Sequence, residues 1–330
     1  MIYTNLYTSE NYFNENEYAP LFAGWMTDTF ESCSNFIQAQ NYVPLGTPLG
    51  EGRSGRIYQL VDDEGGLSQR RDYGGTVDTK VVEGTPVPIY MGINSEKVFA
   101  DYAQGDINGE NEYRRQCEYA LKRLARTMEY KCFNADMDAI DVTDKSGKKK
   151  YDYDGWAKFF KKHPERVKEV LYVGDIVKDV NMKYEADVYL AEANGAVSVD
   201  GENAHIIYCS EGANIKLAAI EANNQEYRGE YKFTNGIRTY KGIPKIVIRD
   251  ANIPADWKEK GDFVLFVNQN EENGAHILVP KTSRNIVVRP DVNTGFGKET
   301  PIDEIFAPAY FNPKAACLCF LNGGEKPAEG

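Results

Sequence analysis

The clearest periodic pattern in this sequence lies between residues 108 and 136, where apolar side chains recur at steps of three and four positions. Charged residues occupy the remaining positions of this segment, which is the pattern of an amphipathic helix with one face toward a core. The core stripe is formed by Tyr113, Cys117, Leu121, Leu124 and Met128. At the α-helical rise per residue, such a helix would be about 43 Å long. The sequence therefore predicts a long rigid helix whose stripe is ordinary protein core.

The segment before this helix has strand-like patches but too little apolar surface to form a core. Residues 56–61 read as one strand and 77–82 as its return, and the glycine pairs Gly65-Gly66 and Gly74-Gly75 suit turns that need positive φ. A lone two-stranded ribbon is marginally stable in water. We therefore expect the ribbon, within residues 50–90, to become ordered against other copies of the chain.

Charges of both signs cover this ribbon, which favours self-complementary contacts over the binding of a partner of one sign. The candidate contact residues are Arg53, Arg56, Asp62, Asp63, Glu64, Arg70, Arg71, Asp72 and Lys80. The alternative interpretation is a hairpin whose charges are simply solvated.

Weaker patterns predict the other elements. An amphipathic helix with a break near Ser32 is expected over residues 17–40. After a charged turn at 141–150, helices are expected at 155–162, 165–171 and 211–223, the last capped by Ser210. Strands are expected at 204–209, 244–248, 263–267, 276–279, 285–288 and 315–321. Short strands separated by Asn, Gly and Pro indicate an α+β module that is mainly antiparallel.

The composition describes an ordinary globular protein of 330 residues with 42% hydrophobic content. A net charge of -12 and a pI near 4.9 argue against a surface specialised for phosphate backbones. No apolar run is long enough for a membrane span, and the N-terminal residues do not resemble a signal peptide, so a cytosolic protein is expected. The six scattered cysteines suit reduced core thiols. Cys317 and Cys319 would share one face of a strand.

One motif points to a different class of protein. Residues 50–55 match the G-x-G-x-x-G loop of protein kinases, and Lys80 could pair with phosphates held there. The other kinase motifs are incomplete, because Arg249-Asp250 lacks the preceding His and Asp262-Phe263 is followed by Val264. A flexible hinge at the base of the ribbon is the competing and favoured interpretation.

Catalytic chemistry has little other support. His163, His205 and His276 have no nucleophile paired with them in sequence, and metal-ligand spacings are absent. Acidic residues are too numerous for the sequence to single out a catalytic pair. We expect no enzyme activity, no cofactor and no metal.

The order of these elements resembles the major capsid proteins of tailed bacteriophages, which have the HK97-like fold. Residues 240–254 are also similar to a phrase that recurs in such proteins, a strand after a glycine followed by a polar loop ending in proline. The resemblance implies an N-terminal arm at 1–49, an extended β-hairpin called the E-loop at 50–90, and a peripheral domain at 91–150 that contains the spine helix. A mainly axial domain at 151–280 and C-terminal strands at 281–330 that return to the peripheral domain would follow.

The resemblance further implies a structural function. Copies would form pentamers and hexamers of an icosahedral shell, assembled in the host cytoplasm, that encloses double-stranded DNA without sequence-specific binding. The implied partners are the chain itself, a separate scaffolding protein, a portal and decoration proteins, with no membrane. The alternatives are an encapsulin-like compartment, another phage structural protein of the same fold, and the kinase-like phosphotransferase.

Overall fold

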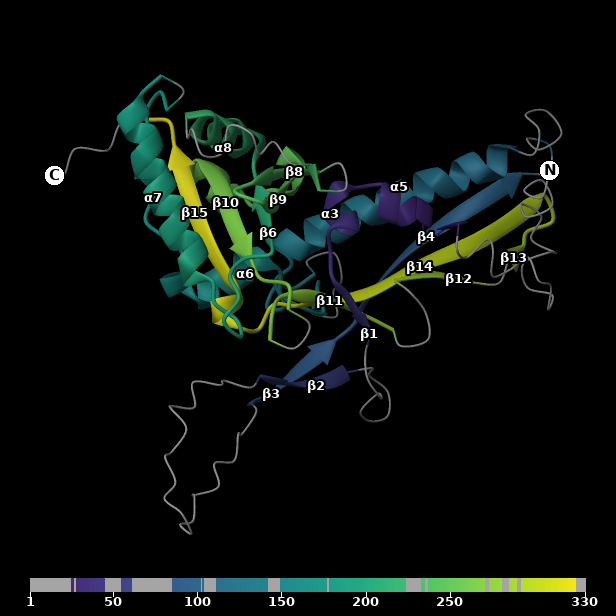
Figure 1. The fold of residues 1–330 in the computed structure, drawn as a ribbon. Coiled ribbons are helices and arrows are strands. Elements are labelled where there is room, and N and C mark those ends of the chain that lie inside the picture. The colour runs from purple at the N-terminus through teal and green to yellow at the C-terminus, as the bar shows by residue number, and fades with distance from the viewer. Residues whose placement is uncertain are drawn as a thin grey trace, which may run out of the picture.

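The chain folds into an elongated region built around one long helix and a broader α/β region at the end of that helix (Figure 1). The structure is a computed structural model, and it describes residues 25–26, 28–44, 55–60, 85–101, 103, 111–141, 149–176, 178–223, 233–234, 237–270, 273–280, 285–289 and 292–324.

The long helix is α5, Asn111–Asn134, and it confirms the central prediction from the sequence. The five residues of its predicted core stripe are all buried, with Cys117, Leu121 and Met128 fully so. Its 24 residues give a rod of about 36 Å. The predicted end at residue 136 lies two residues beyond the helix, and residues 108–110 lie outside the described residues. Near it lie helical residues 25, 26 and 28–32 and the short α3, Asn35–Gln38. Ser34 caps α3 by accepting a hydrogen bond from the Phe36 N–H.

Two long strands run along α5, and the sequence pattern indicated neither of them. They are β4, Gly92–Asp101, and β14, Gly297–Ala309, paired antiparallel over ten residue pairs. The sequence pattern does not indicate β4, because inward positions such as Asn94 and Glu96 are polar. Their side chains are paired with polar partners instead of packing as apolar core residues.

Other strands extend this layer beside β14. Among the described residues, the sheet comprises β1 (Tyr42–Pro44), β11 (His276–Val279), β14, β12 (Ile286–Val288), β13 (Val292–Asn293) and β4. Strand β1 pairs parallel to β11, which ties the N-terminal segment into the layer.

The α/β region contains a second sheet, of seven strands in the described part of the chain. Its order is β5 (Leu171–Tyr172), β15 (Ala316–Asn322), β10 (Asp262–Val267), β6 (Ile206–Cys209), β9 (Ile243–Val247), β8 (Ile237–Tyr240) and β7 (Phe233–Thr234). The pairs β6–β9 and β5–β15 are parallel and the other neighbours antiparallel. The C-terminal strand β15 thus lies in this second sheet, whereas β12–β14 belong to the layer beside α5.

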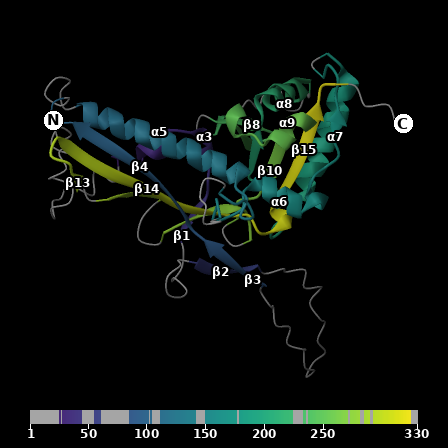
Figure 2. The same cartoon turned by 180° about the vertical axis from the view of Figure 1, so that it is seen from behind.

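Alternation along the strands of this sheet separates two cores. In β10, Phe263 and Leu265 belong to the larger cluster around α5, while Val264 and Phe266 belong to a smaller one. The smaller core packs under α7, Val180–Ala196, and α8, Glu211–Asn223. Figure 2 shows both helices at the end of the molecule away from β13.

The expected helix at 165–171 is wrong, because only the 3-10 turn η2, Pro164–Arg166, forms there before β5. Helix α7 was not predicted, since its weakly amphipathic sequence carries apolar residues on its exposed face as well. Short elements complete the fold: α6 (Trp156–Lys162), η3 (Asp250–Asn252), α9 (Ala255–Lys260) and η4 (Pro313–Ala315).

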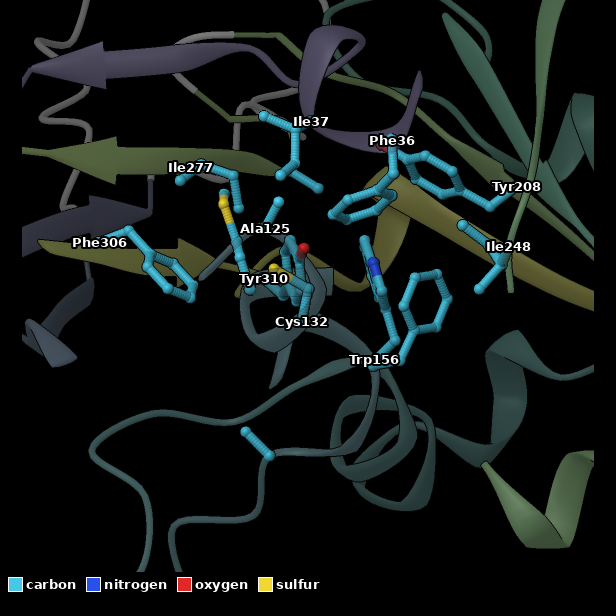
Figure 3. Packing of buried hydrophobic residues seen from close by; sticks show 14 of the residues in the cluster. Phe36, Ile37, Ala125, Cys132, Trp156, Tyr208, Ile248, Ile277, Phe306 and Tyr310 are labelled. Carbon is cyan, nitrogen blue, oxygen red and sulfur yellow. The ribbon is translucent and has the colours of Figure 1, made fainter. Parts of the chain in front are cut away.

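Aromatic side chains join the two regions where α5 meets the second sheet (Figure 3). Trp156 stacks on Tyr310 with ring centroids 3.8 Å apart. Phe133, near the end of α5, contacts the rings of Phe36, Tyr208, Trp257 and Phe263. Gly155 is required here, because a Cβ at this position would lie 2.7 Å from the Lys131 carbonyl oxygen. The larger core is therefore continuous between the regions.

Candidate assembly surface

The ribbon predicted from the sequence is present at its base. Strands β2, Gly55–Leu60, and β3, Thr85–Tyr90, pair antiparallel from Gly55 opposite Tyr90 to Leu60 opposite Thr85. Within the described residues they form a sheet of two strands with no third neighbour. The ribbon leaves the body where β3 leads into β4 (Figure 1). Its outer edges therefore carry backbone groups that a strand of another chain could pair with.

The strand opposite β2 is β3, further along the chain than the predicted return strand. Residues 77–82 lie outside the described residues. So do Arg53, Asp62, Asp63, Glu64, Arg70, Arg71, Asp72 and Lys80, and of Arg56 only the backbone in β2 is described. The contacts proposed for these side chains remain predictions.

The face of the β4–β14 pair that points away from α5 is a second candidate surface. Cross-strand partners share a face, so Ile93, Phe99 and their partners Ile305 and Glu299 lie together on it. Ile93 is 60% and Phe99 43% exposed. Between them, Lys97 forms an ion pair of 3.3 Å with Glu299. This layer is therefore covered on one face by α5 and offers apolar side chains on the other.

A third exposed apolar site caps the far end of the same layer. The β13–β14 hairpin turns through Gly295, whose φ of +87° suits glycine, and Phe296 beside it is 82% exposed. Val292 at the start of the hairpin is 55% exposed. An aromatic ring at the tip of a rigid hairpin is suited to insertion into a neighbouring protein.

The outer face of α5 has a different character, because it is basic and aromatic. Its exposed members include Arg115, Tyr119, Lys122, Arg123, Arg126 and Tyr130. Arg123 is held by Glu96 of β4 at 3.0 Å, and the Lys122 amine lies 5.8 Å from the Tyr119 ring centroid. In a chain with a net charge of -12, this helix presents a locally positive face.

Helix α7 adds an exposed apolar stripe at the opposite end of the molecule. Val180, Tyr184 and Val188 follow one another at steps of four, and Tyr184 is 73% exposed. The buried side of the same helix packs on the second sheet. Both ends of the molecule thus carry apolar surface.

Asp250 and Asp262, two residues of the kinase-like interpretation that the structure describes, have structural roles. Asp262 accepts a hydrogen bond from the Ser210 hydroxyl at 2.8 Å and forms an ion pair of 2.8 Å with Lys216. Ser210 also caps α8 through the Ala213 N–H, as predicted. Asp250 is exposed in η3 and pairs with Lys258. The carboxylate of Asp262 therefore organises the start of α8.

The cysteines and histidines likewise lie in packed or paired positions. Cys317 and Cys319 share one face of β15 in the smaller core, and burial raises the pKa of the Cys319 thiol. His276 is fully buried, while His163 and His205 lie beside Glu165 and Glu202. Among the described residues, no three His, Cys, Asp or Glu side chains are grouped as metal ligands. In that same part of the chain, no helix has both the length and the apolar character that a bilayer span needs.

In sequence, neither a protein-family model nor a curated protein matches this chain. Solved structures do match it over most of its length. One is the SrpI encapsulin complex of Synechococcus elongatus, with 12% identity, a TM-score of 0.54, and coverage of 89% of this chain and 90% of that one. Mycobacterium phage Bobi gives 12% identity, a TM-score of 0.53 and coverage of 88% and 91%. The capsid of an empty GTA particle gives 11% identity, a TM-score of 0.54, and coverage of 88% of this chain and 90% of that one.

The chain has the HK97-like capsid fold. Within it, α5 is the long helix that the sequence predicted. At identities of 11% and 12%, the similarity concerns the path of the backbone and transfers no role to an individual residue.

Proposed function

We propose that this chain is a major capsid protein, whose copies assemble as pentamers and hexamers into an icosahedral shell around double-stranded DNA. The observation that carries the proposal is the HK97-like fold, matched over 88% or more of the chain by shell proteins of several kinds. The role proposed is structural, without catalysis. Its place would be the capsid of a virion, assembled in the host cytoplasm.

The exposed surfaces support self-association. The β2–β3 ribbon, which we interpret as the base of the E-loop, offers sheet edges, while Phe99 and Phe296 offer apolar anchors on a rigid layer. The sheet edges of the ribbon and the apolar anchors lie on different parts of one subunit. Each copy can therefore bind one neighbour through one surface and be bound by another neighbour through the other surface. Such head-to-tail contacts close into rings when the rotation permits.

Enclosure of DNA is supported by the basic outer face of α5. Lys122 and Arg126 are exposed on it, and they could lie against phosphates without reading bases. The acidic remainder of the chain would keep the binding of DNA weak, which suits a shell that must release its DNA.

A second candidate is an encapsulin-like compartment that holds protein cargo, since an encapsulin has the same fold with a similar TM-score. Expression of the full chain, negative-stain microscopy and nuclease protection separate the two. Closed particles with protected DNA would support the capsid proposal, and closed particles with protein and no nucleic acid would support the compartment. A chain that stays monomeric at high concentration would contradict both.

Deletion of residues 62–75 tests the structural role against the kinase-like alternative. A shell subunit should still fold but lose assembly, because the tip of the ribbon would no longer reach its neighbour. A phosphotransferase that used the loop at 50–55 should keep its oligomeric state.

Further partners belong to the same proposal: a separate scaffolding protein, a portal and decoration proteins. A separate scaffold leaves the subunit uncut. Intact mass spectrometry of mature particles should therefore give the full-length subunit, and the loss of a long terminal segment would contradict this part of the proposal.

A further inference from the structure

Two thiols lie next to each other on strand β15. Cys317 and Cys319 are two positions apart, so both point to the face of the second sheet that carries the smaller core. The rise of a strand separates such positions by about 6.7 Å along the backbone. Their side chains come closer than that, because the Cys319 S–H donates a hydrogen bond to the Cys317 sulfur. Neither sulfur belongs to a disulfide.

A third cysteine of the same core is too distant to join this pair. Cys209 of β6 lies opposite Val264 of β10, and Val264 lies opposite Cys319, so the three side chains form a row across the sheet. Two strand spacings, about 9.6 Å, separate the ends of this row. Among the described residues, no group of three His, Cys, Asp or Glu side chains could hold a metal ion. Any ion at this position would therefore have two protein ligands.

Positive charge lies beside the pair. Arg166 and Lys168, in the segment between η2 and β5, are the cationic neighbours of Cys317. The Arg166 side chain is held by carbonyl oxygens, since its Nε donates to the Ala316 oxygen at 3.1 Å and its Nη2 to the Ala196 oxygen at 2.6 Å. In the part of the chain that the structure describes, no carboxylate pairs with this guanidinium. Its charge thus remains available to balance an anion at the thiols.

Helix α7, which runs beside β15 (Figure 1), covers the pair with an aromatic ring. The hydroxyl of Tyr189 lies within hydrogen-bonding reach of the Cys319 sulfur and donates to the Glu169 oxygen at 2.7 Å. The Lys168 amine lies 5.2 Å from the centroid of the Tyr189 ring and forms an ion pair of 2.8 Å with Glu192. The side chain of Lys168 is 24% exposed, so only a long, flexible side chain separates the thiols from solvent.

We propose that Cys317 and Cys319 form a two-coordinate site for a soft monovalent cation, copper(I). The ion would replace the two thiol protons, which pass to solvent, and two S–Cu bonds would form without any transfer of electrons. Two thiolates and one Cu⁺ carry a net charge of -1, which the Arg166 guanidinium would balance. Thiolates select soft ions such as Cu(I). Zinc is a poor match, because structural zinc sites need four ligands.

The sequence analysis predicted no metal because it looked for the spacings of four-ligand sites. A two-ligand site needs only the alternation of one strand, which places positions two apart on the same face. Bound copper(I) would stabilise the folded subunit by mass action. Both ligands and the balancing charge belong to one chain, so binding does not depend on assembly.

The test is an anaerobic titration of the reduced, full-length chain with copper(I), in competition with the chelator bicinchoninate. One ion should bind per subunit, and X-ray absorption at the copper edge should show two sulfur ligands. Cys317→Ala and Cys319→Ala should each lose the ion to the chelator. Cys209→Ala, a matched change in the same core, should keep it. Arg166→Gln should keep both sulfur ligands but weaken binding by about tenfold, the lower end of the effect expected for a group outside the ligand set.

Copper that the wild-type chain does not retain against the chelator would overturn the proposal. So would copper retained by the double variant Cys317→Ala with Cys319→Ala, since that result identifies binding at another cysteine. If either cysteine variant fails to fold, the absorption spectrum of the wild-type complex decides: nitrogen or oxygen ligands, or more than two sulfurs, would contradict the site. These measurements use the subunit and do not require particles, so they are independent of the proposed capsid function.

Discussion

The carboxylate of Glu129, inside α5, accepts a hydrogen bond of 2.9 Å from the side-chain amide of Asn252 in η3. The same carboxylate accepts from the Ser34 hydroxyl at 3.1 Å and from the Arg249 backbone N–H at 3.2 Å. Glu129 is 1% exposed. One buried side chain thus joins the N-terminal segment, helix α5 and the loop that follows β9.

Replacing Glu129 by Ala should therefore destabilise the subunit strongly. The change leaves the buried Asn252 amide and the part-buried Arg249 N–H without this acceptor, at a cost of about 3 kcal/mol. Urea denaturation of the dissociated subunit measures the effect. The control is Glu118→Ala on the same helix, whose partly exposed pair with Arg114 should contribute no more than about 0.5 kcal/mol. Equal midpoints for the two variants would contradict the role given to Glu129.

Phe133→Ala should be among the most damaging core substitutions. The ring is fully buried among four aromatic partners where α5 meets the second sheet, so its removal leaves a cavity that rigid rings cannot close. The expected loss is about 3–5 kcal/mol in the free energy of unfolding. Tyr130→Ala, on the exposed face of the same helix, should change it by no more than about 0.5 kcal/mol. A small effect at Phe133 would mean that the two regions do not share a core.

Glu304 should make stability depend on pH in an unusual direction. Its pKa is about 8 when folded and near 4.5 as a free group, so the folded state holds the extra proton between these values. Stability is then greatest below pH 4.5 for this group and is lost, by a few kcal/mol, as pH rises toward 8. The observable is the difference between wild type and Glu304→Gln, because histidines and other groups contribute equally to both. A difference that stays constant over this range would contradict the assignment.

Removing the exposed aromatic anchors should weaken assembly without weakening the fold. Phe296→Ser and Phe99→Ser should each raise the subunit concentration needed for assembly by about tenfold, the effect expected for one interface anchor. Light scattering over a concentration series measures this, and thermal unfolding confirms an intact subunit. Ile140→Ser, which alters another exposed apolar residue, is the matched control. Assembly thresholds that match the control would exclude these rings from the contacts.

Reversing the charge on the outer face of α5 should lower nucleic-acid content. The double variant Lys122→Glu with Arg126→Glu removes two exposed positive charges and should still assemble, but particles should retain less DNA and release it at lower salt. Phosphate content per particle gives the readout. Lys178→Glu with Lys258→Glu, two exposed lysines that do not belong to α5, makes the same change in net charge as a control. Equal DNA content in both variants would show that another surface faces the genome.

Much of the fold is determined by local patterns in the sequence. The stripe from Tyr113 to Met128 predicts α5 because helix periodicity is independent of what the stripe packs against. Ser210 predicts the start of α8 for the same reason, since a cap is satisfied within one turn. The pairing of β2 in a ribbon also follows from local signals, although its partner lies further along the chain than the turn residues suggested.

Strand β4 and the buried polar contacts required the tertiary structure, because they depend on residues far apart in sequence. Strand β4 reads as polar until β14 supplies Glu304 for its Asn94 and α5 supplies Arg123 for its Glu96. The contacts of Asn94 with Glu304 and with Lys131 have no sequence signature, since these three residues share neither a motif nor a spacing. The sequence by itself thus determined the long helix α5, the start of α8 and the ribbon that cannot form a core alone, but not helix α7. Only the packing of α5 against β4 and β14 decided which polar groups are buried together, because burial, unlike helix periodicity, is a property of the whole chain.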